Sequence, residues 1–233
     1  AQNETTYADW IEYLRSLPAS EKKKRMPSVA RGSAGGMVEL KEQGKNNWLL
    51  TIQPQTNSYT VRSGETIQYP SRTIRKQQDW SKMPVAGITL DDALAYTAWL
   101  NSSGRIPGAR LCSEHEWERA SKGADDREYP HGDVLGAEDA NFDETYRKDP
   151  NAWGPDEVGS HPSSDSPFNV HDLVGNHFEL ATSSMNESES VYRGGSFFFD
   201  SLTCRSTNRN AIDPTFRSND ITVRLCVTWK SAR

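Results

Sequence analysis

Three stretches of the chain carry apolar residues at three- and four-residue steps, the spacing that places them on one face of a helix. The first, residues 5–17, is followed by a proline, which cannot continue a helix. The second, residues 89–102, starts at Thr89, whose side chain can accept a hydrogen bond from the first helical turn. The third starts at Ser113, which can form a capping box with Glu116. We therefore predict three helices at these positions.

Alternation of apolar and polar residues predicts strands within residues 37–75. Residues 37–40 and 48–52 flank a polar turn. Residues 59–61 and 66–69 flank a second turn, which contains a glycine. This arrangement predicts two consecutive β-hairpins.

Two other stretches lack a regular pattern. Residues 19–36 are first charged and then rich in glycine and small residues, which predicts a linker. From residue 125 onward, glycine, proline and other turn residues dominate. A compact domain rarely carries this much irregular chain unless bound ions or a binding surface order it.

Composition narrows the class of protein. The chain has 233 residues, of which 34% are hydrophobic, and its mean hydropathy is -0.79, so it is polar for a globular domain. Its tryptophans, tyrosines and phenylalanines offset this polarity because each large ring buries much apolar area. The formal charge of -5 argues against a nucleic-acid partner, since phosphate binding needs a concentrated basic face. No apolar run approaches the roughly 20 residues that span a bilayer.

The cysteines bear on the cellular setting. Cys112, Cys204 and Cys226 cannot all pair within one chain, and three are too few for a disulfide scaffold. We therefore favour a reducing, cytoplasmic setting slightly over export, with Cys112 and Cys226 as core residues. A single disulfide between these two is the alternative.

Several blocks occur in an order that is typical of one family. Residues 110–120 read RLCSEHEWERA, residues 172–179 read DLVGNHFE and residues 193–196 read RGGS, followed by Cys204 and two arginines. In this order they resemble the formylglycine-generating enzyme family, also called the sulfatase-modifying factor family, over residues 83–228. The resemblance implies an α+β, C-type-lectin-like fold with two helices, twisted antiparallel strands and a large share of irregular loops.

The resemblance and the patterns together predict three segments. Residues 1–36 are expected to form an N-terminal helix and a linker, with the tail of a preceding module as the alternative. Residues 37–82 are expected to form a hairpin-rich extension of the core. Residues 83–233 are expected to form the family-like core.

The resemblance also implies an active site built on two cysteines that hold copper. Counted from Ser196, the two cysteine positions of the family fall three and eight residues further on, at Phe199 and Cys204. A two-thiolate Cu(I) site needs both soft ligands, and Phe178 stands where the family has an active-site tryptophan. We therefore do not expect copper and assign no catalytic residue, with Cys204 and Ser196 as the candidates if the chain is active.

Structural calcium is the cofactor that the resemblance implies. The transferred ligands of a first site are the side chains of Asp172 and Glu179 and the carbonyls of Gly175 and His177. A second family site begins at Asn141 and Phe142, although its further ligands do not align. Ca²⁺ takes six to eight oxygens, which two carboxylates around a tight turn suit. The alternative is that both carboxylates make structural hydrogen bonds without a metal.

The segment after Ser196 mixes aromatic rings, arginines and amides. Rings offer contact area, and arginine and asparagine give direction, so the mixture suits ligand contact. In lectin-like folds the corresponding segment often lines the binding surface. Alternating burial predicts that Phe197 and Phe199 point inward and Phe198 outward. The predicted ligand-contacting residues are Phe198, Phe199, Arg205, Asn208 and Arg209.

These observations predict a non-catalytic domain that binds a ligand or a partner and forms part of a larger bacterial protein. The first alternative is a copper- and oxygen-dependent oxidase acting on a cysteine or another thiol. Further alternatives are a variable binding protein of a diversity-generating retroelement and a regulatory module fused to a serine/threonine kinase. Whether the ligand is a small molecule, a peptide or a protein stays open.

Overall fold

The helices begin where the sequence supplies caps. The computed structural model describes residues 1–33, 36–185 and 189–228. Thr6, Thr89 and Ser113 each form a capping box at the start of a helix; the sequence predicts the box at Ser113 and predicts Thr89 as a hydrogen-bond acceptor for the first turn. The α-helices in these residues are α1 (Tyr7–Ser16), α2 (Ala19–Lys24), α3 (Leu90–Ser102) and α4 (Glu114–Lys122). None of them is long and apolar enough to cross a lipid bilayer.

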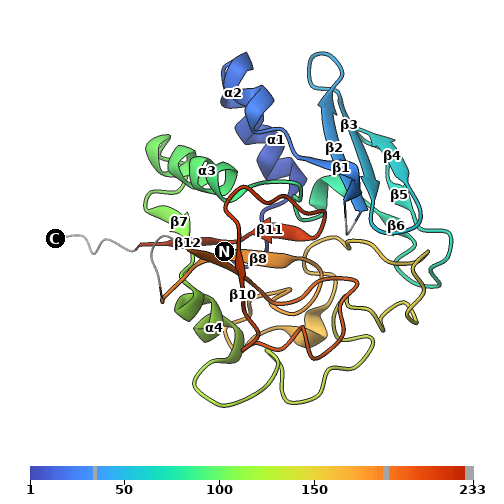
Figure 1. Ribbon diagram of the computed structural model, residues 1–233, viewed down its shortest axis with the longest axis vertical. Coiled ribbons are helices and arrows are strands. Elements are labelled where there is room, and N and C mark those ends of the chain that lie inside the picture. Colours follow the sequence, from blue (N-terminus) through green and yellow to red (C-terminus); the bar gives the residue numbers. More distant parts are fainter. Residues whose placement is uncertain (34–35, 186–188, 229–233) are drawn as a thin grey trace.

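The first hairpin grows into an antiparallel sheet of four strands in the order β1-β2-β3-β4. Strands β2 and β3 pair as the sequence predicts, with Leu40 opposite Leu50. This sheet stands beside α1 at one end of the molecule (Figure 1). Its strands are β1 (Ser28–Ser33), β2 (Gly36–Glu42), β3 (Trp48–Gln53) and β4 (Tyr59–Arg62).

Two predictions for the N-terminal third are wrong. Residues 19–36 do not form a plain linker, because they contain α2 and β1, and β1 pairs antiparallel with β2, the next strand along the chain; residues 34–35 lie outside the described residues. The second hairpin also differs: β4 pairs with β3, whereas β5 (Ile67–Gln68) pairs with β6 (Gln77–Gln78). In both cases the pairing of neighbouring strands in the fold overrides the preference that the local sequence pattern indicates.

A second sheet occupies the middle of the molecule, in the order β10-β9-β8-β11 (Figure 1). Its strands are β8 (Phe178–Thr182), β9 (Ser190–Arg193), β10 (Asn210–Ile212) and β11 (Ile221–Val223), and β11 runs parallel to β8. Next to it, β7 (Ala109–Leu111) pairs with β12 (Leu225–Val227). A disulfide joins Cys112 to Cys226 beside this pair, with the Cα atoms 4.9 Å apart.

One main core joins the N-terminal helix to the rest of the domain. Trp10 and Leu14 of α1 are fully buried, and the Trp10 ring lies 5.1 Å from the ring of Tyr96 on α3. Residues of β8 and β11 belong to the same core. Helix α1 is therefore an integral part of the domain that also contains the central sheet.

The loop-rich region after α4 is held by a buried arginine. Its regular elements up to β8 are limited to the short 3₁₀ helix Pro162–Ser164. The Arg72 guanidinium donates to the carbonyls of Ala152 and Gly154 at 2.7 and 2.8 Å and to the Asp156 carboxylate at 2.5 Å. It also lies 3.6 Å from the ring centre of Tyr69. Internal polar bonds and cation–π contact thus order chain that has no repeating backbone pattern.

Candidate ligand-binding site

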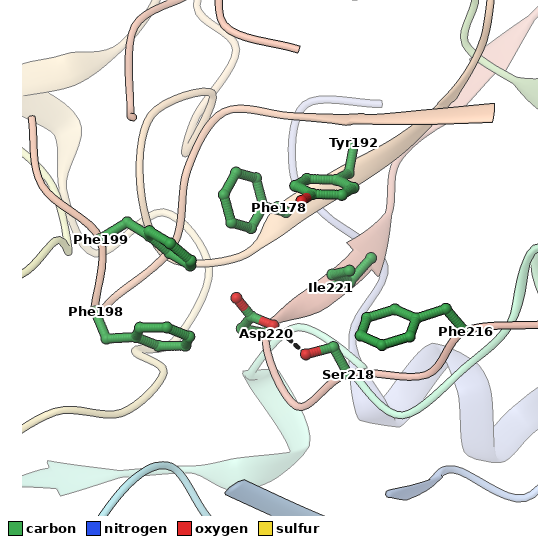
Figure 2. A pocket seen from close by; sticks show the side chains of 8 residues that line it. All are labelled: Phe178, Tyr192, Phe198, Phe199, Phe216, Ser218, Asp220 and Ile221. Carbon is green, nitrogen blue, oxygen red and sulfur yellow. Dashed lines mark hydrogen bonds between the residues drawn. The ribbon is translucent and has the colours of Figure 1, made fainter. Parts of the chain in front are cut away.

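Five aromatic rings and one carboxylate line a cavity of about 230 Å³ beside the central sheet. They come from separate parts of the chain: Phe178 from β8, Tyr192 from β9, Phe198 and Phe199 from the turn after β9, and Phe216 and Asp220 from the segment before β11. Figure 2 shows the rings arranged around the Asp220 carboxylate. The cavity is therefore apolar on most of its wall and carries one acidic group.

The rings support one another by edge contacts and stacking. Phe178 meets Tyr192 and Phe199 edge-to-face, with ring centres 4.6 and 5.2 Å apart. Phe198 stacks on Phe199 at 4.6 Å. Such arrangements hold aromatic rings in defined orientations. The wall of the cavity is consequently preformed on the side of β8 and the turn that follows β9.

Asp220 is buried, with 4% of its surface exposed. Its two carboxylate oxygens accept hydrogen bonds from different serines: Ser196 Oγ at 2.9 Å and Ser218 Oγ. Burial raises the pKa of the Asp220 carboxyl above its usual value. Among the residues that the structure describes, no lysine or arginine forms an ion pair with it. Asp220 is thus a hydrogen-bonded acid without a cationic partner.

The cysteine that aligns with a copper ligand is enclosed. Cys204 has no exposed surface and packs in a small cluster that includes Phe142 and Val174. Burial raises the pKa of its thiol well above the usual value. The backbone of Gly195 approaches it so closely that a Cβ there would lie 2.3 Å from the Cys204 sulfur. The other two cysteines are bonded to each other, so Cys204 is the free cysteine of the described chain.

The predicted calcium residues form hydrogen bonds of their own. Both carboxylate oxygens of Glu179 accept from Arg224, at 2.8 and 2.5 Å, and one also accepts from Trp117 at 2.7 Å. Asp172 accepts from the Gly159 amide at 2.5 Å. Because an arginine already neutralises Glu179, this carboxylate does not fit a Ca²⁺ ligand. No group of three or more histidine, cysteine or acidic side chains in the described ranges is placed to hold a metal ion.

The backbone groups predicted for the same site lie in a tight contact between two loops. A Cβ at Gly175, whose φ is +73°, would lie 2.3 Å from the Asn141 carbonyl oxygen. His177 is buried, and burial lowers the pKa of its imidazole to about 3. Burial outweighs the opposing effect of the Asn219 backbone, so the imidazole is neutral at ordinary pH.

The second predicted calcium position leaves one oxygen free. Asn141 Oδ1 is buried without a hydrogen-bond partner, whereas its Nδ2 donates to the Gly154 carbonyl at 2.9 Å. The Phe142 carbonyl accepts from the Thr145 amide at 3.1 Å. One free oxygen is well short of the six to eight that Ca²⁺ takes. Calcium stays a prediction, which a chelation experiment described below tests.

The structure brings together only part of the predicted ligand face. Phe198 and Phe199 line the cavity. Arg205 forms an ion pair with Glu128, and Arg209 forms one with Glu114. Asn208 donates a hydrogen bond to the Thr203 carbonyl. These three predicted residues, Arg205, Asn208 and Arg209, do not line the cavity. The expected alternation also fails at Phe199, which is half-buried like Phe198, because this segment is a turn and a two-residue period does not apply.

Four residues that line the cavity were not predicted from the sequence to contact a ligand: Phe178, Tyr192, Phe216 and Asp220. They are separated by up to 42 positions along the chain, between 178 and 220, and no local motif connects them. The cluster of three phenylalanines after Ser196 was the available signal. It identified one wall of the cavity.

The sheets, the two central helices and the long ordered loops define an α+β domain of the C-type-lectin-like class. The profile of the family described as the sulfatase-modifying factor enzyme 1-like domain matches residues 4–229, and the chain belongs to this family. This confirms the resemblance and extends it to the N-terminal segment. A search of curated proteins gave no match.

Solved structures share the fold at low sequence identity. PvdO from Pseudomonas aeruginosa is 18% identical with a TM-score of 0.63, over 96% of this chain and 77% of that chain. CarF is 17% identical with a TM-score of 0.57, over 96% and 83% of the respective chains. Treponema denticola variable protein 1 is 17% identical with a TM-score of 0.55, over 85% and 97%. At these identities the likeness concerns the fold alone.

Proposed function

We propose that this chain is a non-catalytic member of its family that binds a small ligand in the aromatic cavity. The observation that carries the proposal is the state of the cysteines. Cys112 and Cys226 are bonded to each other, so neither thiol is available to join Cys204 in a two-thiolate Cu(I) site. Cys204 itself is enclosed and has a raised thiol pKa, which disfavours the thiolate that a soft metal requires.

The position of the missing cysteine supports the same proposal. Phe199 stands there, and its ring packs against Phe178 and Phe198 and lines the cavity. Phe178 in turn stands at the position of the family's active-site tryptophan. Phe199 adds an apolar ring where the family has a thiol, and Phe178 keeps an aromatic ring in the wall of the pocket, an arrangement that suits binding better than redox chemistry.

Ser196, the other candidate for catalysis, is in a structural position. It has no exposed surface, and its hydroxyl donates to Asp220. A hydroxyl that donates to a buried carboxylate supports the floor of the cavity. We therefore assign Ser196 to the positioning of Asp220.

Copper binding and oxygen consumption test the non-catalytic part of the proposal. The oxidised protein should bind less than one equivalent of Cu(I) and consume no oxygen in the presence of a cysteine-containing peptide. The Cys204→Ser variant should behave identically. Stoichiometric Cu(I) together with oxygen uptake that disappears in Cys204→Ser would overturn the proposal and favour the oxidase alternative.

A pair of cysteine variants checks the alignment on which this argument depends. Phe199→Cys restores the second cysteine of the family pattern, and Phe198→Cys adds a thiol one residue away. If position 199 is correctly aligned, Phe199→Cys should bind Cu(I) more tightly than Phe198→Cys. Equal affinities would show that the missing ligand belongs elsewhere.

A further inference from the structure

The charge and the walls of the cavity together point to the class of ligand. We propose that the cavity binds a small organic cation, with an amine or a methylated ammonium group placed against the aromatic rings and the Asp220 carboxylate. This inference rests on the proposed binding function and deepens it by naming the ligand chemistry.

The rings provide the first part of the argument. The faces of aromatic rings carry negative charge density and attract cations, most strongly where water is excluded. Phe178, Phe198, Phe199, Tyr192 and Phe216 surround one space from several directions (Figure 2). An ammonium group that enters this space can contact more than one ring, which is the geometry of an aromatic cage.

The carboxylate provides the second part. A buried charge without a partner carries a large desolvation cost, which a cation in contact with it offsets. Two other buried acids of this chain have such a partner, Glu179 with Arg224 and Asp156 with Arg72, whereas Glu4 and Asp172 are buried away from this cavity. Asp220 has two serine hydroxyls instead. It is therefore a buried acid at which a ligand can supply the positive charge.

The alternatives fit the same cavity less well. An anionic ligand would place like charge against Asp220. A neutral apolar ligand would cover the carboxylate without pairing it, which adds the cost of desolvation. The volume of about 230 Å³ is below the roughly 300–1,000 Å³ typical of pockets for larger organic molecules. The ligand, or the part of it that enters, is therefore a small head group.

Choline and its neutral isostere 3,3-dimethylbutanol, which differ in one charged atom, test the proposal by isothermal titration calorimetry. Choline should bind the wild-type protein at least about tenfold more tightly than the isostere. Asp220→Asn, which keeps the shape and an acceptor for the serines, should weaken choline about tenfold and leave the isostere nearly unchanged. Phe216→Leu should weaken choline by about threefold or more through loss of one ring.

Matched controls separate a local effect from a general one. Asp126→Asn removes one negative charge at an exposed site outside the cavity, and Phe168→Leu removes a ring that is 53% exposed and does not line it. Neither should change the choline affinity by more than about twofold. Thermal melting of every variant checks the fold, and Phe216→Leu carries the test if Asp220→Asn does not fold.

The outcomes distinguish this inference from the proposed function. Equal binding of choline and the isostere, or unchanged binding by Asp220→Asn, would overturn the cationic assignment and leave a binding domain. Absence of binding by primary, tertiary and quaternary ammonium probes alike would also overturn it. Failure of the proposed function is read independently, from copper-dependent oxygen uptake that requires Cys204.

Discussion

Arg224 and Glu179 form a buried ion pair in which the guanidinium donates to both carboxylate oxygens, at 2.8 and 2.5 Å. The side chains are 3% and 0% exposed, so water competes little for either group. The remaining donors of Arg224 reach the carbonyls of Gln2 and His171. One pair therefore connects the N-terminal residues, the loop before β8 and the central sheet.

Removal of one charge from this pair should destabilise the domain strongly. Glu179→Gln leaves the Arg224 charge buried without a counterion, and we expect unfolding to become easier by about 3–5 kcal/mol in urea titrations. Glu12→Gln is the matched control because its pair with Arg105 is about half exposed on both sides, at 51% and 48%. That change should cost less than about 1 kcal/mol. Equal effects would contradict the structural role of the buried pair.

Calcium chelation should leave the melting temperature unchanged. The reason is that Arg224 already satisfies Glu179, the carboxylate on which a calcium site would depend. Thermal melting with and without EGTA, together with a metal inventory of the purified protein, checks this expectation. A stoichiometric calcium content and a clear drop in melting temperature on chelation would instead support the calcium assignment made from the family resemblance.

Acid should destabilise the domain through His177. Burial lowers the pKa of this imidazole to about 3, whereas an unfolded histidine titrates near 6.5. The unfolded state therefore binds a proton first, so the contribution of His177 is complete above about pH 6.5 and is lost as the pH falls toward 3. In this window the stability of the wild type relative to His177→Gln should decrease by up to about 1.4 kcal/mol per pH unit.

The comparison with a variant is needed because other groups titrate in the opposite sense. Burial raises the carboxyl pKa of Glu4, Asp172 and Asp220, so protonation of these acids favours the folded state as the pH falls. Urea titrations of both proteins at several pH values cancel these shared contributions. A difference that does not change with pH would show that His177 is not the buried neutral base that we describe.

Reduction of the disulfide should weaken the fold. Cys112 and Cys226 are 114 positions apart, and the chain-entropy model gives about 4–5 kcal/mol for a loop of this length. Urea titrations with and without dithiothreitol measure the effect. Thiol counting after denaturation supplies the control, with one reactive thiol in the oxidised protein and three in the reduced one. Three thiols before reduction would contradict the pairing.

Local signals in the sequence predicted α1, α3, α4 and the first hairpin, but not α2. Thr89 and Ser113 lie within three residues of the acids that complete their capping boxes, so the pattern is visible in a short window. The β2–β3 pair is joined by a short polar turn and was equally visible. The family blocks then predicted the fold class, because their order reflects the whole domain.

Long-range contacts could not be predicted from the sequence. Arg72 meets Asp156 across 84 positions, and nothing around either residue indicates the partner. The cavity combines residues from β8, β9, the turn after β9 and the segment before β11, so only the phenylalanine cluster was apparent in advance. The β5–β6 pair is local, with Ile67 opposite Gln78, and it was missed because the two glutamines of β6 do not show the alternation of apolar and polar residues that indicates a strand.

The tight contact between Gly195 and Cys204 makes the thiol a natural reporter of loop opening. A Cβ at Gly195 would already lie 2.3 Å from the sulfur, so an alkylating reagent can reach it only when the turn between these residues swings away. That turn also carries Phe198 and Phe199. The rate at which Cys204 is alkylated therefore measures how often the aromatic wall detaches, and an occupant of the cavity should slow it.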